Sequence, residues 1–409
     1  MTRRQLLSLM AASAAQGATP EVTKSEVFRA GTSGYATYRI PGMVVTARGS
    51  ILAYCEARKS TRGDWGTIDI MLRRSTDGGR TWSPQRVISN VPGPHHKNTV
   101  ALAQKLATEG EVTYNNPVAI PSRKRGVVHF VHCVEYMRAF YMRSDDDGKT
   151  FSAPREITSA FEPFRGEYDW KVIATGPGHG IELANGRLVI PVWMSLGTGG
   201  HAHRPSVAST IYSDDQGATW HRGEIALPNQ GEWNIPNETA AVELSDGSVM
   251  LNSRSESTAN RRLITMSKDG AKGWSTPQFH PQLLEPICMA TMVRYSTAKY
   301  GGKDRLLFAN PDNLEVTGKK AEPGKSRDRK NVTVKLSYDE GKTWPVSRSI
   351  EPGFSGYSDL AVMSDGSILL LYEKAPDGAR AFAPDSLTLA KFPLAWLTNG
   401  ADTSKKGGR

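Results

Sequence analysis

The sequence has 409 residues, with 51 Lys and Arg against 41 Asp and Glu, and a formal net charge of +10 at pH 7. A hydrophobic content of 38% with 22% charged residues is typical of a globular chain and excludes a fibrous or wholly disordered one. The positive charge would attract anionic ligands, but no basic run is interleaved with aromatic residues, so nucleic acid is not expected as a partner.

The first 18 residues, MTRRQLLSLMAASAAQGA, have the layout of an export signal. Two arginines precede a short apolar run and then small residues, and the Thr-Arg-Arg opening looks like a twin-arginine signal. The apolar run is too short for a permanent membrane anchor, and no other segment has 18 consecutive apolar residues. We therefore expect a monomeric protein without a membrane anchor, located in the periplasm or secreted.

A pattern S-x-D-x-G-x-T-[W/F] recurs five times along the chain. The copies are STDGGRTW from Ser75, SDDDGKTF from Ser144, SDDQGATW from Ser213, SKDGAKGW from Ser267 and SYDEGKTW from Ser337. Asp and Gly favour tight turns, so each copy is predicted to form a hairpin tip that follows a strand. The fourth copy is degenerate, with Ala271 and Gly273 where Gly and Thr are expected. We interpret these boxes as structural rather than catalytic.

A second repeated unit, strand–turn–strand, lies between the boxes, over 43–58, 181–193, 242–254 and 361–374. Hairpin and box alternate at a spacing of roughly 50–70 residues, which suits about four strands per unit. Five boxes and one unit without a recognisable box predict an all-β fold, a six-bladed β-propeller of four-stranded antiparallel blades. We expect one catalytic domain over 19–398 and a disordered tail over 399–409, with a helix considered only near 98–107.

Three cysteines, Cys55, Cys133 and Cys288, stand at wide spacings inside apolar stretches. This pattern indicates buried thiols rather than disulfides or a metal site. The histidine pairs at 95–96 and 201–203 have no acidic or Cys neighbours, so we interpret them as loop residues that could border a pocket. No metal or other cofactor is expected.

The candidate functional residues lie between the boxes. They are Arg39 in YRIPG, Asp64 in the polar loop RKSTRGDWG, Glu238 and Arg254 at the two ends of one hairpin, Arg329 ahead of the last box, and Tyr357 and Glu373 in the stretch SGYSDLAVMSDGSILLLYE.

In this order the motifs resemble the exo-α-sialidase (neuraminidase) family with Asp-box (BNR) repeats over most of the chain. The resemblance rests on YRIP, the Asp boxes, GPGHGIELANGRLVIP at 176–191, the Asn-Glu hairpin that ends in Arg254, and Arg-x-Asn-x-Thr followed by Gly-Tyr-Ser-Asp-Leu. It implies a retaining exo-glycosidase that hydrolyses terminal α-linked sialic acids from glycoconjugates through a covalent glycosyl-tyrosine intermediate.

The resemblance implies that Arg39, Arg254 and Arg329 bind the sugar's carboxylate, a task for which paired guanidinium hydrogen bonds are suited. Arg327 competes for the third position, but the spacing to the last box favours Arg329. Glu373 would brace Arg39. Arg58 is expected to contact the upper face of the substrate or a bracing acid.

The resemblance further implies that Tyr357 is the nucleophile, Glu238 its partner base and Asp64 the acid/base. A neutral phenol avoids the repulsion that a carboxylate nucleophile would meet from the substrate's own carboxylate. Asp69 competes with Asp64, but TIDIML alternates like a strand and places Asp69 in the lead to the first box.

Several alternatives stay open from the sequence. We expect 95–116 and 159–173 to form pocket walls for the N-acyl and glycerol arms, but the deaminated sialic acid Kdn or another nonulosonic acid would fit the arginines equally well. A non-catalytic sialoside-binding lectin has no need for Tyr357 and Glu238 together. A propeller glycosidase for neutral glycans would leave three arginines without an anionic partner.

Overall fold

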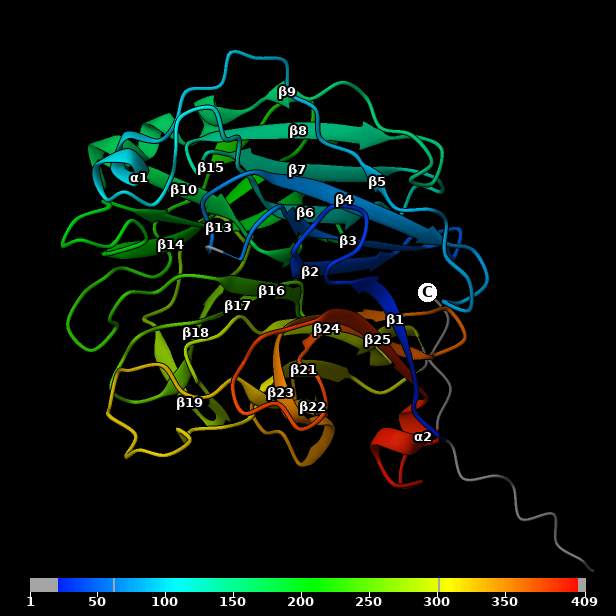
Figure 1. Ribbon diagram of the computed structural model, residues 1–409. Coiled ribbons are helices and arrows are strands. Elements are labelled where there is room, and N and C mark those ends of the chain that lie inside the picture. The colour runs from blue at the N-terminus through cyan, green and yellow to red at the C-terminus, as the bar shows by residue number, and fades with distance from the viewer. Residues whose placement is uncertain (1–20, 62, 301, 404–409) are drawn as a thin grey trace, which may run out of the picture.

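The computed structural model describes residues 21–61, 63–300 and 302–403 and consists mainly of β-strands (Figure 1). The helical segments in this part of the chain are short; they are α1 (Thr99–Ala103), η1 (Thr158–Ala160), η2 (Glu162–Gly166), η3 (Ala298–Tyr300) and α2 (Leu394–Leu397). No helix among these residues is long and apolar enough to cross a membrane. The all-β prediction is confirmed, and α1 lies in the stretch where the sequence indicated a helix.

Two of the sheets have four antiparallel strands each. One has the order β2-β3-β4-β5 and contains β2 (Thr37–Val45), β3 (Ile51–Arg58), β4 (Ile68–Ser75) and β5 (Arg86–Val87). The other has the order β16-β17-β18-β19 and contains β16 (Thr239–Glu243), β17 (Val249–Ser253), β18 (Arg261–Ser267) and β19 (Gln278–Leu284). The pairs β2–β3 and β16–β17 are hairpins that the sequence predicted.

Two further sheets have five strands. One has the order β11-β6-β7-β8-β9 and contains β6 (Tyr114–Pro121), β7 (Val128–Val134), β8 (Arg138–Ser144), β9 (Arg155–Glu156) and β11 (Gly178–His179), which is parallel to β6. The other has the order β10-β13-β14-β15, with β12 also paired to β13; it contains β10 (Val172–Thr175), β12 (Ile181–Glu182), β13 (Leu188–Ser195), β14 (Ser206–Ser213) and β15 (His221–Arg222).

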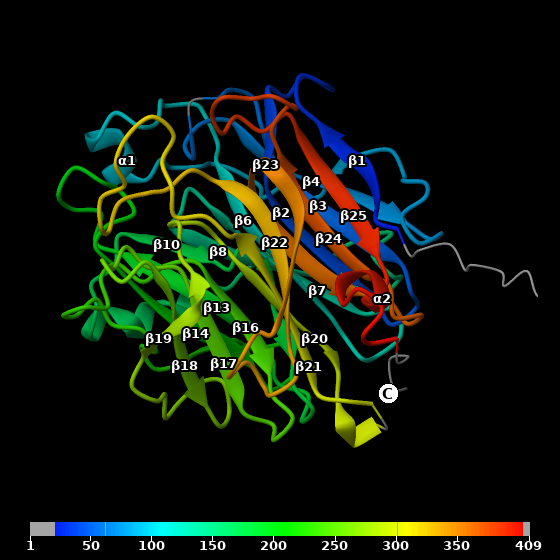
Figure 2. The same cartoon turned by 90° about the horizontal axis from the view of Figure 1, so that it is seen from below.

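The fifth sheet has seven strands in the order β1-β25-β24-β23-β22-β21-β20. It contains β1 (Thr23–Arg29), β20 (Thr291–Ser296), β21 (Arg305–Pro311), β22 (Lys330–Ser337), β23 (Val346–Val362), β24 (Ile368–Lys374) and β25 (Ser386–Phe392). The 17-residue β23 pairs with β22 through its first part and with β24 through its second, and it runs between these two groups of strands in Figure 2. Because of this long strand and the short β11 and β12, the hydrogen-bonded sheets are not uniformly four-stranded.

The sheets close into a circle through their inner strands. β2 contacts β6, β6 contacts β10, and β13 contacts β16; β16 contacts β20, β20 contacts β23, and β23 contacts β2. Apolar side chains fill the space between neighbouring sheets, as where Leu52 and Ile70 belong to one cluster with Phe130 and Met142. The inner strands therefore meet at a common centre, where loops from different sheets can form one pocket.

A buried carboxylate, Asp359 of β23, holds the inner strands together at this centre. It accepts hydrogen bonds from the Met43 N–H and the Thr291 hydroxyl, both at 2.8 Å. It also pairs with Nδ1 of His179 at 2.7 Å. Burial acts to lower the pKa of His179, but the Asp359 charge, the hydrogen bond to Asp359 and a backbone hydrogen bond to Met292 together raise it above its ordinary value. One side chain thus joins segments from three sheets.

The Asp boxes form the predicted hairpin tips. In the second box the Ser144 hydroxyl donates to Asp146, the Gly148 N–H donates to Ser144, and Thr150 donates to Asp146 through its N–H at 2.8 Å and its hydroxyl at 2.6 Å. The first, third and fifth boxes repeat these bonds. The described residues that line the central pocket include none from a box.

The box glycines also join neighbouring sheets. Gly148 has a φ of +76°, and a Cβ at this position would lie 2.6 Å from Leu52 of the preceding sheet. In the degenerate fourth box the glycine is shifted by one residue: Gly270 donates its N–H to Ser267 and approaches Val189 of the preceding sheet. The shift explains how the fold tolerates the missing glycine at the usual position.

Beyond α2, the described chain continues to residue 403 and is packed against the rest of the protein, although the sequence predicted a disordered tail from residue 399. The expected disordered tail over 399–409 is wrong for its first part, because Asp402 is buried and accepts two 2.9 Å hydrogen bonds from the buried Arg305. A buried guanidinium needs such a partner. Residues 404–409 and the predicted export signal over 1–18 lie outside the described residues, so export to the periplasm or medium stays a prediction.

Candidate active site

A pocket with an empty volume of about 680 Å³ lies where the inner strand ends meet. It brings together residues that are far apart in the sequence; those predicted from the sequence and found in its lining are Arg39, Asp64, Glu238, Arg254, Arg329 and Tyr357. Glu373 lies under Arg39, and Arg58 is buried beside Asp64.

Arg39 projects from a bulge in β2. The pairing with β3 shifts register between Arg39 and Gly42, and Ile40 has a φ of +58°, which is rare for a β-branched residue. The buried Glu373 carboxylate accepts four hydrogen bonds. Its Oε1 accepts from Arg39 Nε at 2.9 Å and from the Ile40 N–H at 3.1 Å. Its Oε2 accepts from Arg39 Nη2 and from the Tyr357 N–H, both at 3.1 Å. Glu373 therefore fixes both the arginine and the strand that carries the tyrosine.

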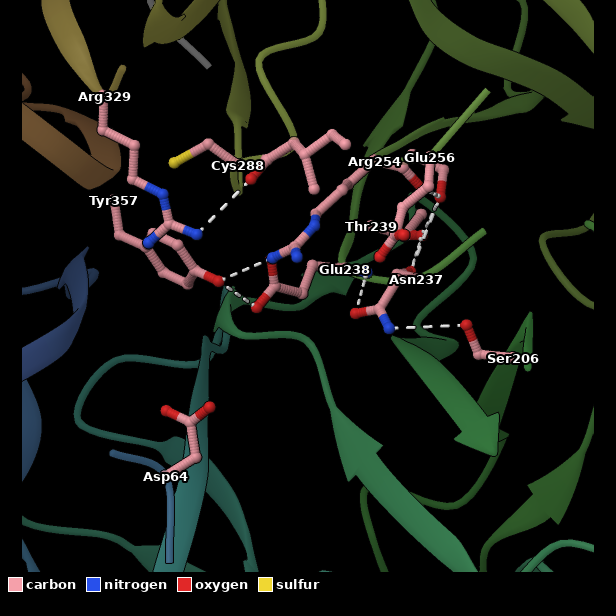
Figure 3. A network of polar contacts seen from close by, with 12 residues as sticks. Asp64, Ser206, Asn237, Glu238, Thr239, Arg254, Glu256, Cys288, Arg329 and Tyr357 are labelled. Carbon is pink, nitrogen blue, oxygen red and sulfur yellow. Dashed lines mark hydrogen bonds and ion pairs between the residues drawn. The ribbon is translucent and has the colours of Figure 1, made fainter. Parts of the chain in front are cut away.

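Tyr357, Glu238 and Arg254 are joined to one another by three short polar contacts (Figure 3). Its hydroxyl donates to Glu238 Oε1 at 2.5 Å and accepts from Arg254 Nη1 at 2.9 Å, and the same Nη1 lies 2.7 Å from Glu238 Oε2. Burial and the Glu238 charge raise the pKa of Tyr357 well above its ordinary value, whereas Arg254 and Arg329 act to lower it. The phenol is therefore neutral, with its proton directed at a carboxylate.

Glu238 and Arg254 are adjacent because they continue the β16–β17 pairing. Thr239 pairs with Ser253, and the next backbone bond runs from the Arg254 N–H to the Glu238 carbonyl at 2.9 Å. Burial acts against the guanidinium charge, but Glu238 raises the pKa of Arg254 well above its ordinary value. The hairpin that the sequence predicted places an acid and an arginine side by side.

Arg329 precedes β22, and aromatic rings flank its guanidinium. The guanidinium carbon lies 5.0 Å from the Tyr357 ring centroid and 5.6 Å from that of Phe382, and the corresponding distances from Arg39 are 5.3 and 5.9 Å. Arg39 and Arg254 each pair with a carboxylate, whereas Arg329 forms no ion pair within the described part of the chain. Its hydrogen bond is to the Ile287 carbonyl at 3.4 Å. Phe382 was not identified from the sequence, because its loop carries no motif.

The rival Arg327 does not line this pocket. Its guanidinium donates to Asn260 Oδ1 at 3.0 Å and to the carbonyls of Glu322 and Lys325. The structure thus separates two arginines that the sequence could distinguish only by spacing.

Asp64 approaches the Tyr357–Glu238 pair from the opposite side of the pocket (Figure 3). It lies in the loop after β3, and its Oδ1 is 2.9 Å from Nη2 of Arg58, with 42% of the aspartate side chain exposed. Desolvation acts to raise the pKa of Asp64, but Arg58, then His203 and Arg39, lower it well below its ordinary range. Asp64 is therefore a carboxylate in this structure.

Arg58 supports the loop that carries Asp64. Besides that ion pair, it donates to the buried Glu56 at 3.1 and 2.6 Å and to the Gly63 carbonyl at 2.8 Å. It is 2% exposed and is not among the pocket-lining residues of the described chain. The rival Asp69 lies on β4 and accepts a 2.7 Å hydrogen bond from the Tyr35 hydroxyl, likewise outside the lining.

An aromatic wall closes another side of the pocket. The His203 ring lies 5.0 Å from Tyr136 and 5.1 Å from Trp193, centroid to centroid, and all three line the pocket together with His201. Burial lowers the pKa of His203 to about 4, so the ring is neutral near pH 7. The suggestion that 201–203 borders the pocket is confirmed, whereas Tyr136 and Trp193 were not identified as pocket residues from the sequence.

The expected pocket walls are only partly correct. Of the segment 95–116, Asn116 lines the pocket, whereas the lining includes no described residue of 159–173. Phe161, Phe164 and Trp170 of that segment are buried in an apolar cluster instead. Their apolar side chains contribute to packing between sheets rather than to the site.

Comparison with family models supports the repeats found in the sequence. Residues 95–370 match the BNR repeat-like domain family, and residues 73–84 match the BNR/Asp-box repeat.

Similar sequences include a sialidase of Micromonospora viridifaciens, 30% identical over 93% of this chain and 55% of the relative, and a sialidase of Bacteroides fragilis, 29% identical over 85% and 62%. This chain thus spans a little more than half the length of these two relatives. Sialidase-3 of Mus musculus is 26% identical over 86% of this chain and 90% of its own length.

Solved structures share the fold. The Hadza microbial sialidase Hz136 has a TM-score of 0.70 at 27% identity and covers 92% of this chain and 69% of its own. The Trypanosoma rangeli sialidase in complex with 2,3-difluorosialic acid, described as a covalent intermediate, has a TM-score of 0.66 at 20% identity over 93% of this chain and 60% of its own.

Proposed function

The chain belongs to the sialidase family with BNR repeats, and on this premise we propose that it is an exo-α-sialidase, a glycoside hydrolase that releases terminal α-linked sialic acids from glycans. The observation that carries the proposal is the Tyr357 hydroxyl, 2.5 Å from Glu238 and 2.9 Å from Arg254, in a pocket that Arg39 and Arg329 also line. A binding protein has no use for a phenol whose proton is directed at a carboxylate.

The three arginines bind the carboxylate of the sugar. Arg39, Arg254 and Arg329 come from different strand ends but line one pocket, where their guanidinium groups can donate several charge-assisted hydrogen bonds to a single anion. The acids Glu373 and Glu238 orient two of them. A neutral sugar would leave Arg329, which forms no ion pair among the described residues, without an anionic partner.

Tyr357 attacks the anomeric carbon while Glu238 takes its proton. The raised pKa of Tyr357 means that the phenol cannot ionise by itself near pH 7, and the short hydrogen bond to Glu238 gives the proton a path as the bond to carbon forms. The charge on the developing phenolate is offset by Arg254 and Arg329. A covalent glycosyl-tyrosine then forms, and water releases the sugar with retained configuration.

Asp64 donates a proton to the leaving glycosidic oxygen and later activates the water. Its lowered pKa in the free protein comes from cations that include Arg39. A bound substrate carboxylate offsets part of this positive charge, so binding raises the pKa of Asp64 toward the value that an acid requires. The pKa of Asp64 seen in the pH dependence of kcat, which reports the substrate complex, is therefore expected to be higher than the one seen in kcat/KM, which reports the free enzyme.

We also propose that the closed circle of sheets is a six-bladed propeller. The support is that β23 has two pairing partners: counting its two parts separately divides the seven-stranded sheet into β20-β21-β22-β23 and β23-β24-β25-β1. Together with the other four sheets this gives six groups around the pocket.

The deciding experiment compares wild type, Tyr357→Phe and Asp64→Asn on a fluorogenic α-sialoside and on sialyl-lactose, with the Kdn analogues in parallel. Tyr357→Phe should lose at least about 10³-fold in kcat on all substrates. Asp64→Asn should lose about 10²–10⁴-fold on sialyl-lactose and much less on the fluorogenic substrate, whose leaving group needs little protonation. Wild type that binds sialosides but releases no sugar would refute the hydrolase and favour the lectin.

The covalent step has its own test. A 2,3-difluoro sialic acid should label wild type and the label should map to Tyr357 by mass spectrometry. NMR of the first product formed should show the α-anomer. Labelling at another residue, or a β-anomer as first product, would reject the glycosyl-tyrosine route while leaving hydrolysis intact. A preference for the Kdn substrates would assign the pocket to deaminated sugars.

A further inference from the structure

A second groove, with an empty volume of about 710 Å³, adjoins the active-site pocket. The two share Arg329, which lines both. The groove is otherwise formed by residues ahead of β22, by Phe354 of β23 and by Arg380, Ala381 and Phe382 of the loop between β24 and β25. Of the residues to which we assign a role in the reaction, Arg329 is the one in this lining, so the rest of the groove requires another explanation.

The chemistry of the proposed reaction determines which part of a glycan passes near Arg329. In a sialoside the carboxylate and the glycosidic oxygen are bonded to the same carbon atom. A carboxylate held by Arg39, Arg254 and Arg329 therefore places the departing sugar within a few bond lengths of this arginine cluster. A groove that begins at Arg329 therefore starts beside the carboxylate of the bound sugar.

The charges of the groove select an anionic occupant. Among the described residues, the lining contains one carboxylate, Asp328, whose Oδ2 accepts from the N–H and hydroxyl of Thr317 at 2.8 and 2.5 Å. Against it stand the guanidinium groups of Arg327, Arg329 and Arg380, so the groove is positively charged overall. The Arg327 guanidinium is engaged by Asn260 and by backbone carbonyls. Arg329 is assigned to the carboxylate of the released sugar. Arg380 is exposed and forms no ion pair among the described residues, so it is the further cation of the groove that is available to a ligand.

Two aromatic side chains complete the groove. Phe354 and Phe382 are both half-buried and both line it, so each presents part of a ring to the space. Aromatic rings offer a flat apolar surface to the C–H face of a sugar, while the guanidinium of Arg380 offers hydrogen-bond donors to an anion. The combination suits a sugar with a negative charge better than a neutral one.

We propose that this groove is a subsite for the sugar next to the one released, and that Arg380 binds an anionic substituent of that sugar. The inference rests on the proposed sialidase function and adds a preference to it: glycans whose penultimate residue carries a carboxylate, as in an α2,8-linked disialyl group, or a sulfate. The shared chemistry is an anion about one sugar away from the scissile bond.

The test measures kcat/KM of the full-length enzyme for three substrates: α2,8-disialyl-lactose, sialyl-lactose sulfated on galactose, and plain sialyl-lactose. Wild type should prefer at least one anionic substrate by about fivefold, the gain expected from one partly exposed ion pair. Arg380→Gln should abolish that preference and change kcat/KM for plain sialyl-lactose by less than about twofold. Arg380→Lys should restore part of it, and 0.5 M salt should weaken it because exposed ion pairs are screened.

Arg125→Gln is the matched control, since Arg125 is also exposed and its loss removes one positive charge outside the groove. A response confined to the disialyl or to the sulfated substrate identifies which anion the subsite takes. An equal preference in wild type and Arg380→Gln, or no preference in wild type, overturns the subsite. Failure to release sugar from any of the three substrates would instead reject the proposed function, so the two failures are distinguishable.

Discussion

The backbone N–H of Tyr357 donates to Glu373 at 3.1 Å, on the carboxylate oxygen that also accepts an N–H of Arg39. One buried acid thus contacts both Arg39, which we propose binds the sugar's carboxylate, and the strand that carries the proposed nucleophile. The gap behind Tyr357 is narrow: a Cβ on Gly356 would lie 2.5 Å from the same oxygen and 2.4 Å from Phe382. The geometry of the site depends on this contact.

Glu373→Gln tests that dependence. The amide can no longer accept from four N–H groups at once, so Arg39 and Tyr357 shift relative to each other, and kcat/KM should fall about 10²-fold. Leaving Arg39 without its buried partner should also cost about 3–5 kcal/mol of unfolding free energy. Steady-state kinetics and urea denaturation measure the two effects; unchanged kinetics in a destabilised protein would show that Glu373 only supports folding.

Phe382→Ala tests whether the aromatic ring positions Arg329. Cation–π contacts with Arg329 and Arg39 contribute about 1–2 kcal/mol together, so KM should rise about tenfold with little change in kcat. Phe382→Leu keeps an apolar side chain but has no ring face and should behave like Ala, whereas Phe382→Tyr should restore KM. Normal KM in the Leu variant would mean that packing alone matters.

Arg58→Met separates a loop-supporting role from direct contact with substrate. Removal of this guanidinium leaves Glu56 buried and unpaired, so the free energy of unfolding should fall by about 3–5 kcal/mol. Thermal denaturation at pH 7 measures the loss, and Arg58→Lys should recover part of it. A variant with wild-type stability but a raised KM would favour the substrate contact that the sequence suggested.

His179 should make stability depend on pH. Its folded pKa is raised above its ordinary value near 6.5, so the stabilisation by the His179–Asp359 pair is fully present below about pH 6.5 and is lost as the pH rises through the folded pKa. Each unit by which the pKa is raised corresponds to about 1.4 kcal/mol. The difference in unfolding free energy between wild type and His179→Gln should therefore shrink from pH 5 to pH 9; a constant difference would contradict a charged pair.

Gly148→Ala tests the contact between an Asp box and the preceding sheet. The alanine would have a positive φ and a methyl group against Leu52, which together should cost about 2–4 kcal/mol. Gly49 is the matched control: its φ is +86°, but nothing lies within 4 Å of an added Cβ, so Gly49→Ala should cost only about 1–2 kcal/mol. Equal losses would show that the contact contributes nothing. Activity per folded molecule should be unchanged in both variants.

Features written in local sequence could be predicted. The box turns follow from Asp, Gly and Thr at fixed spacing, and the Glu238–Arg254 contact follows from a hairpin of predictable register. Family motifs placed Arg39, Tyr357 and Asp64 in one pocket, although no local property distinguishes Asp64 from Asp69.

Features that depend on tertiary contacts could not be predicted. The sequence left open whether Arg58 contacts the substrate or an acid, and its pairing with Glu56 decides for the acid. Phe382 reaches the arginines from a loop without a motif, and Asp402 is buried against Arg305, which lies 97 residues earlier in the chain. The long β23 joins two groups of strands through pairing that neither group's sequence reveals. Each outcome is decided by a partner distant along the chain.

The circular contact of inner strands has a consequence for refolding. Arg39, Glu238, Tyr357 and Asp64 come from three separate sheets, and β2 and β23 meet only where the last sheet returns to the first. Strands can form within individual sheets, and tryptophans can become buried, before that junction forms. The pocket, however, cannot exist until the junction has formed. During refolding, activity should therefore recover later than the spectroscopic signals of secondary structure, at the step in which the last sheet meets the first.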